Sequence, residues 1–143
     1  MTVEEIKSPD GQVLAIFLTP GLPEPGRKFF TRPHESLQAG LIRLVPNEVI
    51  SPHRHRSRCN PQLVETQEML VVTRGSIWVR VFCWGEMVYS NWFQVAERTL
   101  EVGDAVVFLR GGHSVGAIGD DGAEFWEAKT GPWMGPEDKE MLQ

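Results

Sequence analysis

The chain has 143 residues, of which 41% are hydrophobic and 23% charged, with a formal net charge of −5. This length and composition predict one globular domain large enough to bury a hydrophobic core. The acidic balance argues against non-specific nucleic-acid binding, which needs a basic surface. Basic character is local, at Arg54, Arg56 and Arg58, so a small anionic ligand stays open.

The compartment is indicated by three absences in the sequence. Two cysteines, Cys59 and Cys83, are too few for a disulfide scaffold, and we expect free thiols. The first residues are acidic and lack the apolar region of a signal peptide. No apolar run approaches the roughly 20 residues that span a bilayer. We therefore expect a soluble cytoplasmic protein.

The amino-terminal quarter predicts one strand and one linker. Residues 1–12 form a lead-in that closes in a turn at 9–11. Val13–Leu18 is an apolar run of strand length. Residues 19–26 hold three prolines and two glycines, which exclude a helix or a sheet interior. Residues 29–30, two phenylalanines, return the chain to the core.

The middle of the chain predicts a series of strands. Residues 36–45 are apolar on both faces, as in a strand buried between two sheets. Residues 68–73 and 76–83 predict a hairpin across Arg74 and Gly75. Residues 84–93 extend a hairpin or form a covering loop.

The last third continues the pattern. Further strands are predicted at residues 95–101, 105–109, 115–118 and 123–129, with a hairpin turn at 119–122. Residues 137–142 could form one or two helical turns. No longer window shows a helical period, so the chain predicts an all-β sandwich or barrel.

Three histidines stand where strands could bring them together. His53 and His55 are one residue apart, so an extended strand points both to the same face. Glu68 opens an apolar run, and His113 follows a second turn-and-strand pattern. Only one other histidine exists, His34. Three imidazoles and a carboxylate together would make a site for a divalent transition metal.

The order of these residues resembles the two motifs of the cupin superfamily. In the first motif, His53-x-His55 is followed by Glu68 and then by Gly75, with six residues between the last two. The second motif corresponds to residues 103–113, from glycine to histidine. The sequence departs from the family pattern at four points. In the first motif, 12 residues separate His55 from Glu68, where three or four are usual, and the upstream glycine, Gly40, is too far away to count as a match. In the second motif, residue 109 is leucine instead of proline, and the motif is one residue short.

The resemblance implies a fold and a domain organisation. The fold is the cupin double-stranded β-helix, a jelly-roll barrel. Residues 1–143 would form one domain with a barrel core at about 38–131. Residues 1–37 would supply the amino-terminal strand and a Pro/Gly-rich linker, and residues 132–143 a short carboxy-terminal tail.

The resemblance also implies a ligand set. A mononuclear iron, manganese, nickel or zinc ion would be bound by His53, His55, Glu68 and His113. The identity of the ion stays open. So does the fourth ligand, because a β-bulge would let Gln67 exchange roles with Glu68, and Glu65 lies close in sequence.

Two classes of function fit such a site. The first is an enzyme acting on a small molecule, such as a dioxygenase or an isomerase, with Glu127 as a candidate acid or base. An exposed strand carboxylate is the alternative for Glu127. The second class is a non-catalytic protein that binds or senses a small ligand. A sugar-nucleotide epimerase would need a tyrosine, and the single one, Tyr89, is in a predicted loop.

Other residues leave alternatives open. Arg54 and Arg56 form a solvated face or an anion clamp, and Cys59 is a loop thiol or a further ligand. Gly111-Gly112 is a tight turn or lets a ligand approach the backbone. The chain is expected to form a homodimer through Val13–Leu18. Core or dimer-interface positions are expected for most of Trp78, Trp84, Trp92, Phe93, Trp126 and Trp133.

Overall fold

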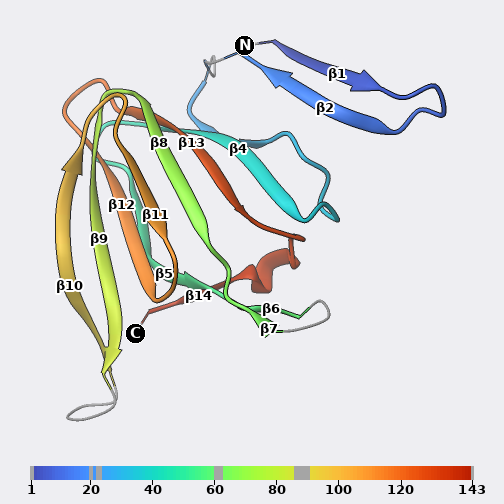
Figure 1. Cartoon of the computed structure of the whole chain (residues 1–143). Helices are drawn as coiled ribbons and strands as arrows, with labels where there is room; N and C mark the ends of the chain where they lie inside the picture. The colour runs from blue at the N-terminus through green and yellow to red at the C-terminus, as the bar shows by residue number, and fades with distance from the viewer. Residues whose placement is uncertain (1, 20, 22–23, 60–62, 86–90, 143) are drawn as a thin grey trace.

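The computed structural model describes residues 2–19, 21, 24–59, 63–85 and 91–142. Two five-stranded antiparallel sheets form the body of the molecule (Figure 1). One contains, in spatial order, β10 (Asn91–Leu100), β9 (Ser76–Gly85), β12 (Gly112–Ile118), β5 (Val49–His55) and β14 (Lys139–Met141). The other contains β11 (Ala105–Phe108), β8 (Glu68–Arg74), β13 (Ala123–Thr130), β4 (Leu37–Leu44) and β3 (Gly26–Phe29).

Smaller elements complete the fold. The strands β1 (Val3–Lys7) and β2 (Val13–Leu18) form a hairpin that projects from the two sheets (Figure 1). The short strands β6 (Arg58–Cys59) and β7 (Leu63–Val64) pair with each other. A 3₁₀ helix, η1 (Gly135–Asp138), precedes β14. The described residues contain no helix long and apolar enough to cross a membrane.

The interior between the sheets changes character along the strands. Inward positions of β13 run from Ala123 and Phe125 to Glu127 and Lys129. The apolar end forms a core of Ile42, Leu44, Leu70, Val72, Ile77, Val79, Phe108, Val115, Ala117, Ala123 and Phe125. The other end buries polar side chains, including Gln38, His53, Glu68, His113, Glu127, Lys129 and Asp138.

Two turns expected to close hairpins instead carry the chain between the sheets. Residues 68–73 do not pair with 76–83, because β8 and β9 belong to opposite sheets. The crossing is at Gly75, whose φ is +68° and where a Cβ would lie 2.3 Å from the Gly122 carbonyl oxygen. Residues 119–122 likewise join β12 to β13 in the other sheet. A tight turn with glycine serves either purpose, so local sequence did not distinguish them.

The hairpin extension at residues 84–93 is confirmed as far as it is described. The strands β9 and β10 pair from Leu100–Ile77 to Asn91–Gly85. Residues 86–90, which include Tyr89, lie outside the described part of the chain.

The two ends of the chain differ from expectation. The predicted lead-in contains β1, which pairs along β2. Phe29 is not in the core but 38% exposed, because it lies on the edge strand β3. The prediction of helical turns at residues 137–142 was wrong, since η1 ends at Asp138 and β14 follows. The tail is extended because its backbone pairs with the free edge of β5.

The apolar end should carry much of the stability. Phe125 has no exposed surface and lies between strands β4 and β8. Phe125→Ala should lower the free energy of unfolding by about 3–5 kcal/mol, because it removes buried contacts and leaves a cavity. Urea denaturation followed by circular dichroism measures the change. Val102→Ala, at a 63% exposed position, should stay within about 0.5 kcal/mol of the wild type; equal effects would contradict the assigned core.

Candidate metal centre

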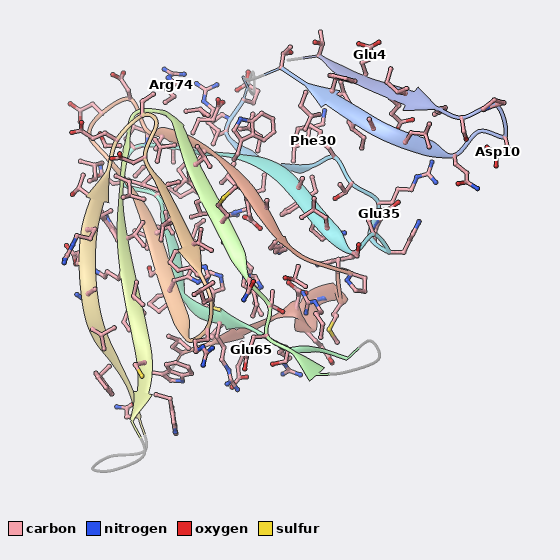
Figure 2. The ribbon with its side chains drawn as sticks, in the orientation of Figure 1. Glu4, Asp10, Phe30, Glu35, Glu65 and Arg74 are labelled. Atoms are coloured by element: carbon pink, nitrogen blue, oxygen red, sulfur yellow. The ribbon has the colours of Figure 1, made fainter. Side chains whose placement is uncertain are left out.

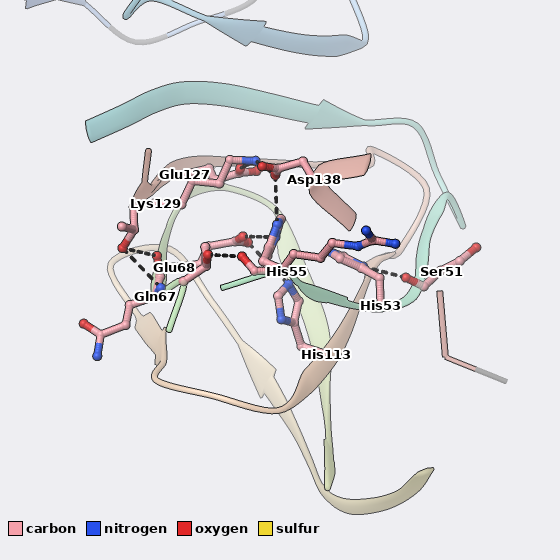
Figure 3. A network of polar contacts seen from close by, with 12 residues as sticks. Ser51, His53, His55, Gln67, Glu68, His113, Glu127, Lys129 and Asp138 are labelled. Atoms are coloured by element: carbon pink, nitrogen blue, oxygen red, sulfur yellow. Dashed lines mark hydrogen bonds and ion pairs between the residues drawn. The ribbon is translucent and has the colours of Figure 1, made fainter. Parts of the chain in front are cut away.

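Two neighbouring strands bring the three imidazoles together. His113 of β12 is the direct pairing partner of His53 of β5, and His55 follows two residues later on the same face. One ring nitrogen from each histidine lies within 4.8 Å of the other two, and all three side chains are buried. Figure 3 shows the three rings converging between the sheets. The predicted cluster is confirmed as a spatial unit that could bind a metal ion.

Glycine allows these strands to approach. A Cβ on Gly112 would lie 3.1 Å from the His53 carbonyl oxygen and 2.5 Å from Leu142 Cδ1. Gly111 has a φ of +82°, and a Cβ there would lie 2.6 Å from the Phe82 carbonyl oxygen. Both glycines are therefore explained by close packing of the chain, with no need for a ligand. His113 is further fixed by stacking on Phe108, with ring centroids 3.9 Å apart.

The ring of His53 is held with one nitrogen free. Its Nδ1 lies 2.8 Å from the Ser51 carbonyl oxygen, which only accepts hydrogen bonds, so Nδ1 carries the proton. Nε2 then presents a lone pair and has no hydrogen-bond partner. Burial lowers the pKa of His53 to about 3, so the imidazole is neutral near pH 7. A neutral ring oriented through its second nitrogen is the form in which histidine binds metals.

His55 is oriented by a carboxylate from the tail. Its Nδ1 lies 3.1 Å from Asp138 Oδ2, and its Nε2 lies 2.6 Å from Glu68 Oε2. The latter pair is close but lacks hydrogen-bond geometry, and both atoms are left without a hydrogen-bond partner. Burial alone would lower the pKa of His55, but the Asp138 and Glu68 carboxylates together raise it.

Of the three side chains considered for the fourth position, Glu68 lies at the imidazoles. It is 5% exposed, and its Oε1 is 3.4 Å from His113 Nε2. Burial would raise the pKa of Glu68, but His113 and His55 hold it well below its usual value. Gln67 and Glu65 are exposed, and Glu65 Oε2 instead lies 3.4 Å from Ser57 Oγ.

A second layer of buried charges surrounds the cluster. Glu127 faces inward, so the exposed alternative was wrong, and its Oε1 lies 3.3 Å from Lys129 Nζ. Lys129 Nζ is also 3.4 Å from Asp138 Oδ2, and Arg58 donates to Asp138 Oδ1. Burial and the charge of Glu68 raise the pKa of Glu127. For Asp138, burial is outweighed by His55, Lys129 and Arg58, which lower its pKa.

Sequence reasoning missed the roles of Asp138, Lys129 and Arg58. Asp138 reaches His55 because β14 pairs with β5, with Lys139 opposite His55. The only local signal was an acidic residue beside a basic one in the tail, which is common on solvated surfaces.

The remaining candidates lie away from the imidazoles. Arg54 is exposed and pairs with Glu140 at 2.6 Å, while Arg56 lies 4.0 Å from Glu137. The solvated-face interpretation of these arginines therefore holds. Cys83 is an exposed free thiol, whereas the side chain of Cys59 lies outside the described residues.

The aromatic residues expected in the core or in a dimer interface do not lie in the core of this chain. Each of Trp78, Trp84, Trp92, Phe93, Trp126 and Trp133 is partly or largely exposed. The strands that carry them direct them outward, and Trp133 follows the last strand of its sheet. Some pack on one another or on cations, as Trp84 does on Trp92 and Arg80 on Trp78.

Among known proteins, only solved structures are similar to this chain. No family model and no curated protein matches the sequence. Among solved structures, Bacillus subtilis oxalate decarboxylase matches with a TM-score of 0.55 and 23% identity, over 76% of this chain and 24% of the decarboxylase. Another structure of that enzyme is described by its Mn(II) centres.

Two further solved structures are similar to this chain over most of its length. Peruvianin-I, a cysteine peptidase from Thevetia peruviana latex, matches with a TM-score of 0.55 and 14% identity, over 75% of this chain and 56% of its own. Oxalate oxidase in complex with the substrate analogue glycolate matches with a TM-score of 0.52 and 16% identity, over 68% of this chain and 43% of its own.

At these identities the likeness establishes architecture and not activity. The chain spans 24% of the decarboxylase and 56% of peruvianin-I. These neighbours are cupin proteins, and their likeness to this chain is one of fold, with two antiparallel sheets and no α-helix in the described residues. The chain has the cupin fold.

Proposed function

We propose that this chain binds one divalent transition metal ion through His53, His55, His113 and Glu68 and acts as an enzyme on a small molecule. The observation that carries the proposal is a set of buried atoms without hydrogen-bond partners. His53 Nε2, His55 Nε2 and Glu68 Oε2 all belong to this set. The last two lie 2.6 Å apart as an ion pair without hydrogen-bond geometry. A buried polar atom without a hydrogen bond costs about 1–3 kcal/mol, and a cation bound by all three atoms would remove that cost.

The donor set fits such an ion chemically. Three imidazoles and one carboxylate suit manganese, iron, nickel or zinc, and hard cations such as calcium prefer oxygen ligands. The carboxylate supplies the negative charge that offsets the cation in a buried site. Ser51 and Asp138 hold the two β5 rings with Nε2 toward the cluster, which reduces the cost of arranging the ligands.

The enzyme hypothesis, a dioxygenase or isomerase, rests on what surrounds these ligands. Once bound, a metal of this kind polarises a substrate oxygen or promotes reaction with dioxygen. Glu127 is buried two strand positions from Lys129. Because burial raises its pKa, its carboxyl keeps a proton to higher pH than an exposed glutamate and could donate or accept one at the substrate.

We further propose that the chain is a homodimer that buries the β1–β2 hairpin. An isolated two-stranded hairpin is at best marginally stable in water. This one exposes apolar side chains on both strands, at Val3, Ile6, Leu14 and Phe17. Exposed apolar surface of this kind is typical of an interface, and a second copy of the chain would cover it.

Removing imidazoles should remove the metal. The double variant His53→Ala, His113→Ala should lose stoichiometric manganese, iron, nickel or zinc, as measured by elemental analysis of the purified protein. His34→Ala is the matched control, because the His34 side chain is 73% exposed and lies beside Glu35. Equal metal content in the folded double variant and the control would contradict the proposed site.

Turnover separates an enzyme from a binding protein. Metal-loaded protein should consume oxygen, or isomerise its substrate, with some member of a panel of diketones, thiols and small organic acids. Stoichiometric metal without turnover would favour the alternative, a protein that binds or senses a small ligand.

Glu68→Gln keeps the side-chain volume but removes the negative charge. Metal affinity should fall by about 10–100-fold, which is the loss measured when a residue that hydrogen-bonds to a metal ligand is replaced.

The dimer is tested by mass. Light scattering at micromolar concentration should return twice the mass of one chain. The double variant Leu14→Glu, Phe17→Glu should shift this to one chain, since it places charges on the proposed interface. Val102→Glu, at an exposed apolar position outside the hairpin, should leave the mass unchanged. A wild-type mass of one chain would overturn the proposal.

A further inference from the structure

A small pocket opens at the edge of the sheet that carries Glu68. Its volume is about 250 Å³. It is lined by Phe29, Thr31, Pro33, Gln38, Lys129 and Trp133. None of these six residues belongs to the proposed ligand set, and the pocket has no role in holding the metal.

Strand register connects this pocket to the imidazole cluster. Lys129 of β13 pairs with Glu68 of β8 on one side and with Gln38 of β4 on the other. All three side chains are buried, and residues directly opposite each other in a sheet share a face. Neighbouring strands are about 4.8 Å apart, so the pocket begins about one strand beyond Glu68, with Lys129 between them. Figure 3 shows Lys129 beside Glu68 and Glu127.

The outer part of the pocket is aromatic. Phe29 lies on the edge strand β3 and Trp133 in the segment before η1, and both are partly exposed. Gly40, opposite Phe29, leaves room for the ring, since a Cβ there would lie 3.0 Å from Phe29 Cδ1. Two aromatic side chains and Pro33 around a small volume favour a flat apolar group.

Lys129 is the one charged residue among the six that line the pocket, and it is buried. Lys129 is 5% exposed, and its Nζ lies 5.1 Å from the centre of the Phe29 ring. Its contacts with Glu127 Oε1 and Asp138 Oδ2, at 3.3 and 3.4 Å, are longer than the 2.7–2.9 Å of a strong charge-assisted hydrogen bond. Asp138 is also engaged by Arg58 and His55. The ammonium has three donors, so it can take an anionic oxygen as a closer partner.

We propose that this pocket binds a small planar carboxylate of the size of one aromatic ring. The carboxylate accepts hydrogen bonds from Lys129 Nζ, and the ring lies between Phe29 and Trp133. The inference rests on the proposed function, because it makes this compound class the substrate, held one strand away from the metal centre. It does not depend on which metal is bound.

Benzoate is the probe, with benzamide as its neutral analogue and cyclohexanecarboxylate as its non-planar one. Calorimetric titration of the metal-loaded protein should give saturable benzoate binding. Benzamide should bind at least about tenfold more weakly, because it lacks the charge that Lys129 pairs with. Cyclohexanecarboxylate should also bind more weakly, since its puckered ring does not fit flat between the aromatic side chains.

Two variants test the residues. Trp133→Ala and Lys129→Gln should each weaken benzoate binding at least about tenfold. Trp84→Ala is the matched control, because Trp84 is also a partly exposed tryptophan but does not line this pocket. Lys129 belongs to a buried ion network, so near-ultraviolet circular dichroism checks its folding. Trp133→Ala tests the pocket if Lys129→Gln does not fold.

Metal content, measured on the same samples, keeps the two proposals apart. Trp133→Ala should retain full metal while losing benzoate affinity. Wild-type benzoate affinity in Trp133→Ala, equal affinities for benzoate and benzamide, or no benzoate binding to metal-loaded protein would each overturn the pocket proposal. Benzoate binding by protein that takes up no manganese, iron, nickel or zinc when these ions are supplied would overturn the proposed function and leave the pocket standing.

Discussion

The pairing of β5 with β12 is the contact on which the candidate centre depends. It places His113 opposite His53 although 59 residues separate them in the sequence. Because side chains alternate, His55 then shares the face of both. Gly112 permits the close approach of the two backbones. A side chain there would press on the His53 carbonyl and on the Leu142 side chain, so both would have to shift.

The interior of the barrel is divided into an apolar end, which stabilises the fold, and a polar end, which contains the candidate site. Along β8 and β13, inward residues change from Val72 and Phe125 at the apolar end to Glu68 and Lys129 at the other. Buried ionisable groups are costly unless they are paired or hydrogen-bonded. Side chains fill the space between the two sheets (Figure 2). The packing at the apolar end offsets the cost of the polar end, where His53 Nε2 and His55 Nε2 have no hydrogen-bond partner.

The sequence allowed the ligands to be predicted better than their surroundings. His53 and His55 follow a period-two rule within one strand, so their common face depended only on local geometry, whereas Glu68 lies in the opposite sheet and was placed by the motif resemblance. The crossing at Gly75 and the strand at residues 139–141 depend on which sheet edge lies nearby, which no local pattern records. Asp138 was missed for this reason, because it reaches His55 only through the pairing of β14 with β5.

Asp138 links the parts of the site that lie on different strands. Its carboxylate contacts His55 on β5, Lys129 on β13 and Arg58 on β6. One anion thus orients a ring of the candidate centre and partly neutralises the Lys129 ammonium that lines the pocket. A carboxylate bound to Lys129 would compete with Asp138 for that ammonium. Asp138 would then interact more strongly with the His55 Nδ1 proton, so occupation of the pocket and the basicity of His55 Nε2 are coupled through one side chain.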